Sequence, residues 1–191
     1  MNLLDLITRW DFSILYFIRE HLQLPFLDSV SVFLSEAFDG GLLWLILCAV
    51  LLVFRKTRGV GIMMLCAMGF ALVIGEWGMK NLFCRLRPCV VDPSVSLAVD
   101  VPKSYSFPSG HTGSSFAAAF ALFLCSKKWG IPALVLAGII GLSRMYLFVH
   151  FPTDVLAGAV LGILCALFAC YLFRKFNLEN KIQKIGINNI F

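Results

Sequence analysis

The sequence predicts an all-α membrane protein, a polytopic transmembrane helical bundle of about five spans preceded by amphipathic N-terminal helices. Of its 191 residues, 60% are apolar and 14% are charged, and the mean hydropathy is +0.88. This composition leaves too little polar surface to cover a soluble globule. Because the apolar residues fall into blocks that suit membrane helices, we expect a single domain over residues 1–191, with a motif-bearing core at about 59–173.

The N-terminal region is expected to form helices that lie along the membrane surface. Phe12–Leu22 mixes apolar residues with Arg19 and Glu20, and Phe26–Ala37 shows a similar mixture. Such a mixture is typical of amphipathic interfacial helices. The pattern leaves open whether either helix crosses the bilayer.

Five spans are expected after these helices. In the first, Leu42–Phe54 is too short alone and must borrow from the stretch after Leu34, where the pair Gly40-Gly41 predicts a break. The other four follow from continuous apolar runs. They are Gly59–Phe83, His111–Cys125, Trp129–Val149 and Val155–Phe173.

Basic residues follow every second span and predict the orientation. The clusters after the first, third and fifth spans are Arg55, Lys56 and Arg58, then Lys127 and Lys128, then Arg174 and Lys175. The side that carries them is expected to be cytoplasmic. Segments 84–110 and 150–154 should then meet on the opposite face. The net charge of +5 favours the bilayer as a partner and not nucleic acid, because the basic residues sit beside apolar spans.

Two cations and a proline mark the end of the second span. Lys80 and Arg87 are seven positions apart, a step that places two side chains on one face of a helix, and Pro88 ends that helix. The pair suits an anion at the membrane surface, although two snorkelling interfacial cations explain the same pattern.

The string Pro108-Ser109-Gly110-His111 opens the third span. Glycine lets the backbone approach a ligand closely, and the free N–H groups of a helix start point at any anion there. His111 would stand beside that anion. A histidine at a helix start is otherwise a cap or a solvated residue.

A third polar group surrounds the turn between the fourth and fifth spans. Arg144 ends one span and His150 precedes the next, so a short turn brings a cation and an imidazole together. Asp154 can hold the other imidazole nitrogen, which is the arrangement of an oriented nucleophile or base. The alternative is a helix-capping aspartate beside an incidental histidine.

The three groups are more informative together than apart. Of the three histidines in the chain, two fall at the face that also carries Lys80, Arg87 and Arg144. Three cations and a helix N-terminus form a site for a multiply charged anion, and two histidines supply a nucleophile and a proton donor. The sequence therefore predicts a phosphate site.

In order along the chain, the three groups resemble the motifs of the type-2 phosphatidic acid phosphatase superfamily. The matching strings are Lys80-x6-Arg87-Pro88, Pro108-Ser109-Gly110-His111 and Ser143-Arg144-x5-His150-x3-Asp154. The resemblance implies a small bacterial membrane enzyme that hydrolyses a lipid phosphate or diphosphate without a metal or other cofactor. It implies that His150 forms a phosphohistidine, that Asp154 orients its ring and that His111 acts as acid and base. The implied phosphate-binding residues are Lys80, Arg87, Ser109, Gly110 and Arg144.

Among lipid substrates, undecaprenyl diphosphate is favoured, because a compact single-domain form with an outward-facing site resembles bacterial enzymes that recycle this carrier. Phosphatidylglycerol phosphate, phosphatidic acid and lipid A are the alternatives, since the motifs bind phosphate and say little about the tail. A non-catalytic anion transporter is disfavoured, because the polar groups gather at one membrane face and line no path through the spans. The site is expected on the periplasmic or extracellular face of a bacterial cytoplasmic membrane. The oligomeric state is left open.

Several residues near the motifs carry weaker expectations. Glu76 lies one turn before Lys80 and is expected to position it through an ion pair. Arg85 is expected to contact phosphate or lipid headgroups, or to be a solvated interfacial residue, and residues 103–106 are expected near the headgroup. Gly158 and Gly162 are expected to permit close helix packing.

Overall fold

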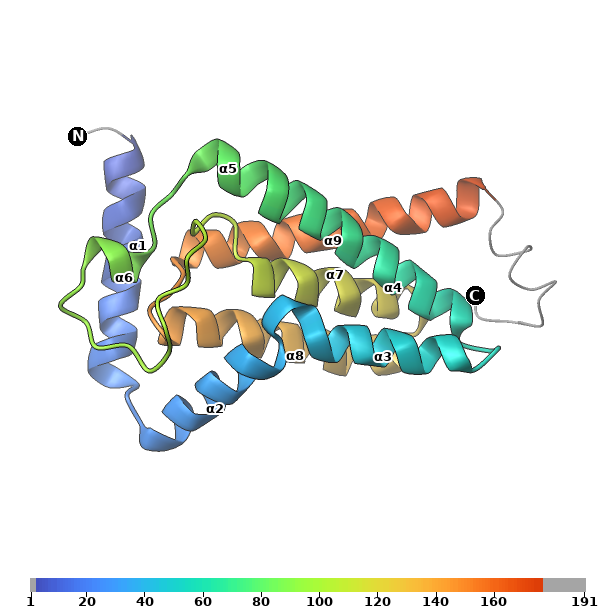
Figure 1. The fold of residues 1–191 in the computed structure, drawn as a ribbon, viewed down its shortest axis with the longest axis horizontal. Coiled ribbons are helices and arrows are strands. Elements are labelled where there is room, and N and C mark those ends of the chain that lie inside the picture. Colours follow the sequence, from blue (N-terminus) through green and yellow to red (C-terminus); the bar gives the residue numbers. More distant parts are fainter. Residues whose placement is uncertain (1–2, 177–191) are drawn as a thin grey trace.

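The computed structural model describes residues 3–176, which form a bundle of helices with one helix running across its end (Figure 1). No strand occurs in this range, which confirms the predicted all-α class. The elements, in order, are α1 (Leu3–His21), α2 (Pro25–Ala37), the 3₁₀ turn η1 (Asp39–Gly41), α3 (Leu42–Val53), α4 (Arg58–Ala71), the π-helical segment η2 (Leu72–Met79), α5 (Lys80–Phe83), α6 (Pro88–Val91), α7 (Gly110–Cys125), α8 (Lys127–Tyr146) and α9 (Pro152–Lys175).

Within the described residues, three segments are long and apolar enough to cross a membrane: Arg58–Val91, Lys127–Tyr146 and Pro152–Lys175. Helices α2 and α3 qualify together as a fourth, bent by 49°. The fifth expected span is α7, an apolar helix of 16 residues. The chain is an integral membrane protein. The predicted break in the first span is confirmed, because Gly40 and Gly41 have φ of 56° and 77°, a left-handed conformation that suits glycine.

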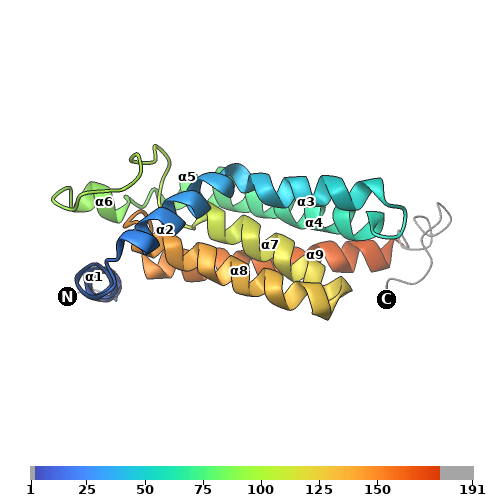
Figure 2. The same ribbon diagram turned by 90° about the horizontal axis from the view of Figure 1, so that it is seen from below.

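Helix α1 lies across the end of the bundle, and Figure 2 shows it nearly end-on. It begins at Leu3 and not at Phe12, so it is longer than the expected segment. Its outward side carries exposed apolar residues such as Trp10 and Phe17, whereas Leu15 and Asp11 are buried against the bundle. Exposed apolar side chains of this kind suit a helix that contacts lipid, and the interfacial position of α1 stays a prediction.

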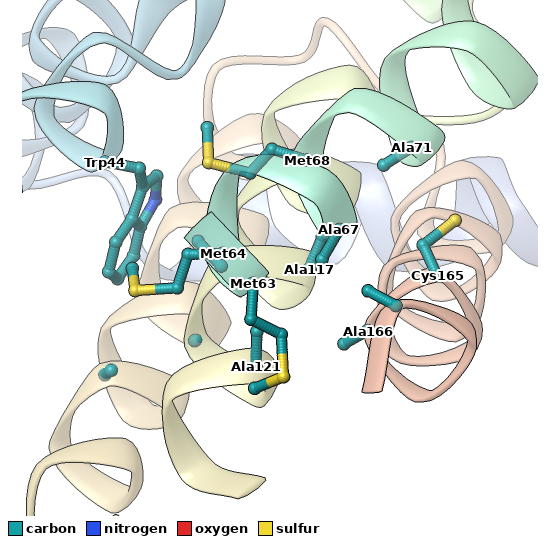
Figure 3. Packing of buried hydrophobic residues seen from close by; sticks show 14 of the residues in the cluster. Trp44, Met63, Met64, Ala67, Met68, Ala71, Ala117, Ala121, Cys165 and Ala166 are labelled. Atoms are coloured by element: carbon teal, nitrogen blue, oxygen red, sulfur yellow. The ribbon is translucent and has the colours of Figure 1, made fainter. Parts of the chain in front are cut away.

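Helix α7 occupies the centre of the bundle and packs against α4, α8 and α9. Its inward faces are made of alanines that have no exposed surface, Ala117, Ala118, Ala119 and Ala121. Small side chains let neighbouring backbones approach closely, which drives helix association where lipid removes the hydrophobic driving force. Buried methionines of α4, Met63 and Met64, fill the remaining space around α7 (Figure 3).

Glycines on α9 allow the closest approach to α7. A Cβ added at Gly162 would lie 2.5 Å from the carbonyl oxygen of Gly113 and 2.8 Å from the amide nitrogen of Ala117. Both neighbours are backbone atoms, which cannot rotate away. The expectation that Gly158 and Gly162 permit close packing is therefore confirmed, since a Cβ at Gly158 would lie 2.6 Å from the Ser109 carbonyl oxygen.

Replacing Gly162 with alanine is expected to lower the free energy of unfolding by about 1–3 kcal/mol, because the helices must separate to admit the methyl group. Gly138 on α8 is the matched control, since no atom lies within 4 Å of a Cβ placed there. Gly138→Ala should leave stability unchanged or raise it slightly. Thermal melting of the purified variants in detergent checks both results, and equal melting temperatures for the two variants would contradict the packing argument.

The two ends of the bundle differ in chemistry. The α3–α4 turn, the α7–α8 turn and the end of α9 lie together at one end, and these segments carry the three basic clusters. The segments joining α5 to α7 and α8 to α9 lie at the other end, beside α1. The polar motifs are thus gathered at the end opposite the basic clusters.

Candidate active site

A cavity of about 1080 Å³ opens at the motif-bearing end of the bundle. Seven of the eight predicted site residues line it: Lys80, Arg87, Ser109, Gly110, His111, Arg144 and His150. The eighth, Asp154, has no exposed surface and contacts His150 from within the protein. The fold therefore brings all eight residues, from three separate chain segments, to one place.

The turn between α8 and α9 sets the position of His150. The backbone N–H groups of Val149 and His150 both donate to the carbonyl oxygen of Arg144, at 3.2 and 3.3 Å. Phe148 is fully buried and has φ of 58°, which is uncommon for a residue with a side chain and reverses the chain tightly. Pro152 then starts α9, where its fixed φ suits the first helical position.

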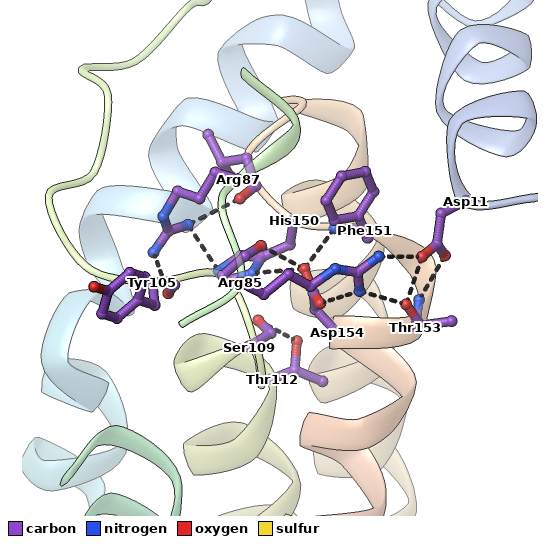
Figure 4. A network of polar contacts seen from close by, with 12 residues as sticks. Asp11, Arg85, Arg87, Tyr105, Ser109, Thr112, His150, Phe151, Thr153 and Asp154 are labelled. Atoms are coloured by element: carbon purple, nitrogen blue, oxygen red, sulfur yellow. Dashed lines mark hydrogen bonds and ion pairs between the residues drawn. The ribbon is translucent and has the colours of Figure 1, made fainter. Parts of the chain in front are cut away.

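His150 is 2% exposed and stands between a cation and a carboxylate. Its Nε2 lies 3.0 Å from a terminal nitrogen of Arg87, and its Nδ1 lies 3.6 Å from Oδ2 of Asp154 (Figure 4). Because a guanidinium only donates, Nε2 must accept, and the proton of a neutral ring then sits on Nδ1 toward Asp154. The Nε2 lone pair is therefore directed at the cationic side of the cavity, where it accepts from Arg87.

Asp154 is held from several directions. Its Oδ2 accepts hydrogen bonds from the Ser106 hydroxyl and from the backbone N–H of Phe151, and its Oδ1 pairs with Arg85 at 2.6 Å. The carboxylate is thus compensated and fixed in orientation. Arg85, expected to face phosphate, lipid headgroups or solvent, instead points at this carboxylate.

Lys80 and Arg87 are both buried and share one hydroxyl. Nζ of Lys80 lies 3.1 Å from Oγ of Ser104, and Arg87 donates to the same oxygen at 3.0 Å and to the Ser104 carbonyl at 2.8 Å. Lys80 also pairs with Glu76 at 2.8 Å, which confirms the expected ion pair. Ser104 therefore orders the two motif cations, and the headgroup contact expected for residues 103–106 stays a prediction.

His111 and Arg144 meet at the end of α2. His111 Nε2 lies 3.1 Å from the carbonyl oxygen of Ser35, and Arg144 donates to the hydroxyl of the same serine. Arg144 is 3% exposed, and its Nε has no partner among the described residues. A buried cation with an unused donor is suited to an anion that enters the cavity.

The N-terminus of α7 forms the floor of the site. Ser109 has no exposed surface, and its hydroxyl accepts a hydrogen bond from Thr112 at 2.9 Å. A Cβ at Gly110 would lie 2.1 Å from a carboxylate oxygen of Glu76, so a side chain there would require the Glu76 side chain to move. The N–H groups at the start of α7 are the feature of this floor that suits an anion.

The pKa of His150 makes stability depend on pH. Burial lowers this pKa to about 3, against the opposing attraction of Asp154. The unfolded value is about 6.5, so between these values the unfolded chain binds the additional proton and acid favours unfolding. The melting temperature should therefore be insensitive to His150 above about pH 6.5 and should fall below it.

Between pH 7 and about pH 4, the melting temperature of His150→Gln should fall less than that of the wild type, because the variant has no imidazole to protonate at this position. The exposed His21 provides the control: His21→Gln should follow the wild-type curve. The measurement is the melting temperature of the three proteins in one detergent across this pH range. If it falls equally in all three, His150 is not the source of the acid sensitivity.

Four residues contact the motif segments in ways that the sequence did not predict. They are Asp11, Ser35, Ser104 and Ser106. Each lies outside the motifs and makes its contact across a long separation in sequence, so no local pattern marks it. Cys84 and Cys89, which flank the end of the second span, are both free thiols. Residues 3–176 contain no group of three or more His, Cys, Asp or Glu side chains placed to hold a metal ion.

Taken together, the fold and the site define a membrane-embedded helical bundle with a histidine pair and three buried cations around one cavity. Comparison with known proteins identifies the family, because the family model of the PAP2 superfamily matches residues 59–178. The chain belongs to the PAP2 superfamily, as the motifs predicted.

Three known proteins show the extent of the likeness. An undecaprenyl-diphosphatase of Sulfolobus acidocaldarius is 36% identical over 141 residues, which are 73% of this chain and 68% of that protein. The crystal structure of Aquifex aeolicus LpxE has a TM-score of 0.74 at 28% identity, covering 84% of this chain and 94% of the other. A PAP2-type phosphatidylglycerolphosphate phosphatase from Bacillus subtilis has a TM-score of 0.71 at 28% identity, covering 88% and 87%.

Proposed function

We propose that the protein is a metal-independent membrane phosphatase that hydrolyses a lipid diphosphate, with undecaprenyl diphosphate as the substrate, through a phosphohistidine intermediate. The observation that carries this proposal is the placement of His150, whose Nε2 faces Arg87 while its Nδ1 faces Asp154. An imidazole held in this way is a nucleophile with a fixed tautomer. The 36% identity to an undecaprenyl-diphosphatase supports the choice of lipid.

In the first step, the Nε2 lone pair of His150 attacks phosphorus, and the bond from phosphorus to the leaving oxygen breaks. His111 donates a proton to that oxygen, so the lipid monophosphate leaves without carrying an additional charge. Lys80, Arg87 and Arg144, with Ser109 and the N–H of Gly110, hold the phosphoryl oxygens as charge redistributes. In the second step, His111 removes a proton from water, which attacks phosphorus and breaks its bond to Nε2. Inorganic phosphate is then released.

The cavity also suits a lipid tail. Beyond the polar groups it is lined by apolar residues of α3, α4, η2 and α9, namely Leu45, Leu65, Met68, Leu72 and Leu161. A polyprenyl chain at this wall would remain in an apolar environment while its diphosphate meets the cations. The expected position of the site on the periplasmic or extracellular face of a bacterial cytoplasmic membrane follows from the basic clusters at the other end.

Phosphate release from a panel of lipids tests the proposal. Purified protein in detergent with EDTA should release phosphate from undecaprenyl diphosphate with a higher kcat/KM than from phosphatidylglycerol phosphate, phosphatidic acid or lipid A. The structural likeness to a phosphatidylglycerolphosphate phosphatase makes that substrate the second candidate. A preference for it would replace the polyprenyl assignment, and loss of all release in EDTA would reject metal independence.

A further inference from the structure

Asp11 is a buried carboxylate on a helix that carries none of the family motifs. It is 1% exposed, although α1 is otherwise a surface helix. One oxygen accepts from the backbone N–H of Thr153 at 3.1 Å, and the other lies 2.6 Å from both the Thr153 hydroxyl and a terminal nitrogen of Arg85. Burying a charged group costs free energy unless its charge and hydrogen bonds are compensated. The burial of Asp11 therefore indicates a specific role for its contacts with Thr153 and Arg85.

Arg85 connects Asp11 to the site. One terminal nitrogen pairs with Asp11 at 2.6 Å, and the other pairs with Oδ1 of Asp154 at 2.6 Å and with the Thr153 hydroxyl at 2.7 Å. The guanidinium carbon also lies 4.0 Å from the centre of the Phe151 ring. Figure 4 shows the Arg85 guanidinium between the carboxylates of Asp11 and Asp154. A planar group that is paired at both ends and stacked on a ring loses most of its conformational freedom.

The charges along this chain of contacts suggest what it does. When His150 bonds to phosphorus through Nε2 and keeps the proton on Nδ1, its ring becomes positive. Asp154 faces that ring, and Arg85 would neutralise Asp154 if Asp11 were absent. With Asp11 present, the three groups carry a net single negative charge, so Asp154 keeps its ability to stabilise the imidazolium.

We propose that Asp11 and Arg85 are positioning residues that act through Asp154 on His150, so that α1 forms an essential part of the phosphoryl-transfer site. Asp11 sets the charge and geometry of Arg85, which fixes Oδ1 of Asp154 and leaves Oδ2 facing the ring. This inference rests on the proposed function, since it assumes that His150 is the nucleophile.

Orthovanadate and inorganic phosphate distinguish positioning from a structural role. Orthovanadate expands to five-coordination by taking an imidazole nitrogen as a ligand, whereas phosphate is held by the cations alone. Asp11→Asn should therefore weaken vanadate binding by about 10-fold or more while phosphate binding changes by less than about 3-fold. Arg85→Lys, which keeps the charge but cannot bridge two carboxylates, should do the same.

Binding is measured by competition in detergent on the full-length protein, with kcat and KM for lipid phosphate release recorded beside it. Glu20→Gln is the control, because Glu20 is an exposed acid on the same helix. The double variant Asp11→Asn, Arg85→Lys should show no further loss beyond the larger single effect, since both residues act along one path.

An unchanged ratio of vanadate to phosphate affinity in the two variants would overturn the positioning role, even if both proteins melted at lower temperature. Should Asp11→Asn not fold, the ratio measured for Arg85→Lys decides alone. A wild type that binds vanadate with Asp11-dependent affinity but releases no phosphate from any lipid would reject the proposed function and leave the positioning role standing. If the wild type releases phosphate and both variants keep its kcat and its ratio of vanadate to phosphate affinity, the positioning role is rejected and the proposed function stands.

Discussion

His150→Ala is expected to reduce kcat for phosphate release from a lipid diphosphate by about 10⁴-fold or more, because the substitution removes the proposed nucleophile. In the structure its Nε2 faces the cationic side of the cavity and Arg87 donates to it at 3.0 Å. Water would have to replace an oriented, desolvated imidazole, and the cations would contribute only the residual rate.

Release is measured with purified protein in detergent containing EDTA. His21→Ala serves as the matched control, because His21 is exposed and lies on α1 away from the cavity lining. His150→Gln provides a second variant of closer volume at this buried position, so that a folding defect in His150→Ala does not decide the result. A phosphoenzyme that is labile in acid and stable in base should form in wild type alone, and release that survives both substitutions would reject the nucleophile.

Arg144→Ala and Lys80→Ala are each expected to lower kcat by about 10²–10³-fold, with smaller changes in KM. Both cations are buried, at 3% and 5% exposure, and both line the cavity. Their positions are set before substrate arrives, Arg144 by Ser35 and Lys80 by Glu76 and Ser104. Preorganised charge of this kind acts most strongly on the transferring phosphoryl group and less on the ground state.

The comparison variant is Lys56→Ala, an exposed basic residue at the opposite end of the bundle. It should leave kcat unchanged, which separates the local effect from a change in net charge. Steady-state kinetics over a range of lipid concentrations in mixed micelles provides kcat and KM for each protein. If kcat is unchanged in both Arg144→Ala and Lys80→Ala, the assignment of these cations to phosphoryl transfer is wrong.

Local sequence was sufficient for the long apolar helices and for the motif residues, but not for the end of the second span. The expectation that Lys80 and Arg87 share a helix that Pro88 ends is wrong, because α5 stops at Phe83, Cys84 turns into the left-handed conformation and Pro88 begins α6. The spans were predicted because hydrophobicity and helix length are properties of a continuous segment, and the break at Gly40-Gly41 because glycine alone takes the left-handed conformation cheaply. Seven of the eight predicted site residues line the cavity because every second loop of an up-and-down helical bundle emerges at the same face.

The partners of those residues were beyond local reasoning. Arg85 reaches Asp11 across 74 positions, Arg144 reaches Ser35 across 109 and Thr153 reaches Asp11 across 142. The same sequence environment around Arg85 suited phosphate, headgroup or solvent equally well. Only the packing of α1 across the bundle end turns its guanidinium toward two carboxylates.

By itself, the sequence determined the membrane class, the succession of apolar helices and the identity of the family motifs, because each depends on neighbouring residues. The tertiary structure alone decided that α1 packs against α8 and α9 and pairs Asp11 with Arg85, that Ser35 and Ser104 order the cations and that Arg85 faces Asp154. Those contacts depend on which helix faces meet, and that is settled by the small residues of α7 and α9 together with the pairing of buried charges. No single segment contains this information.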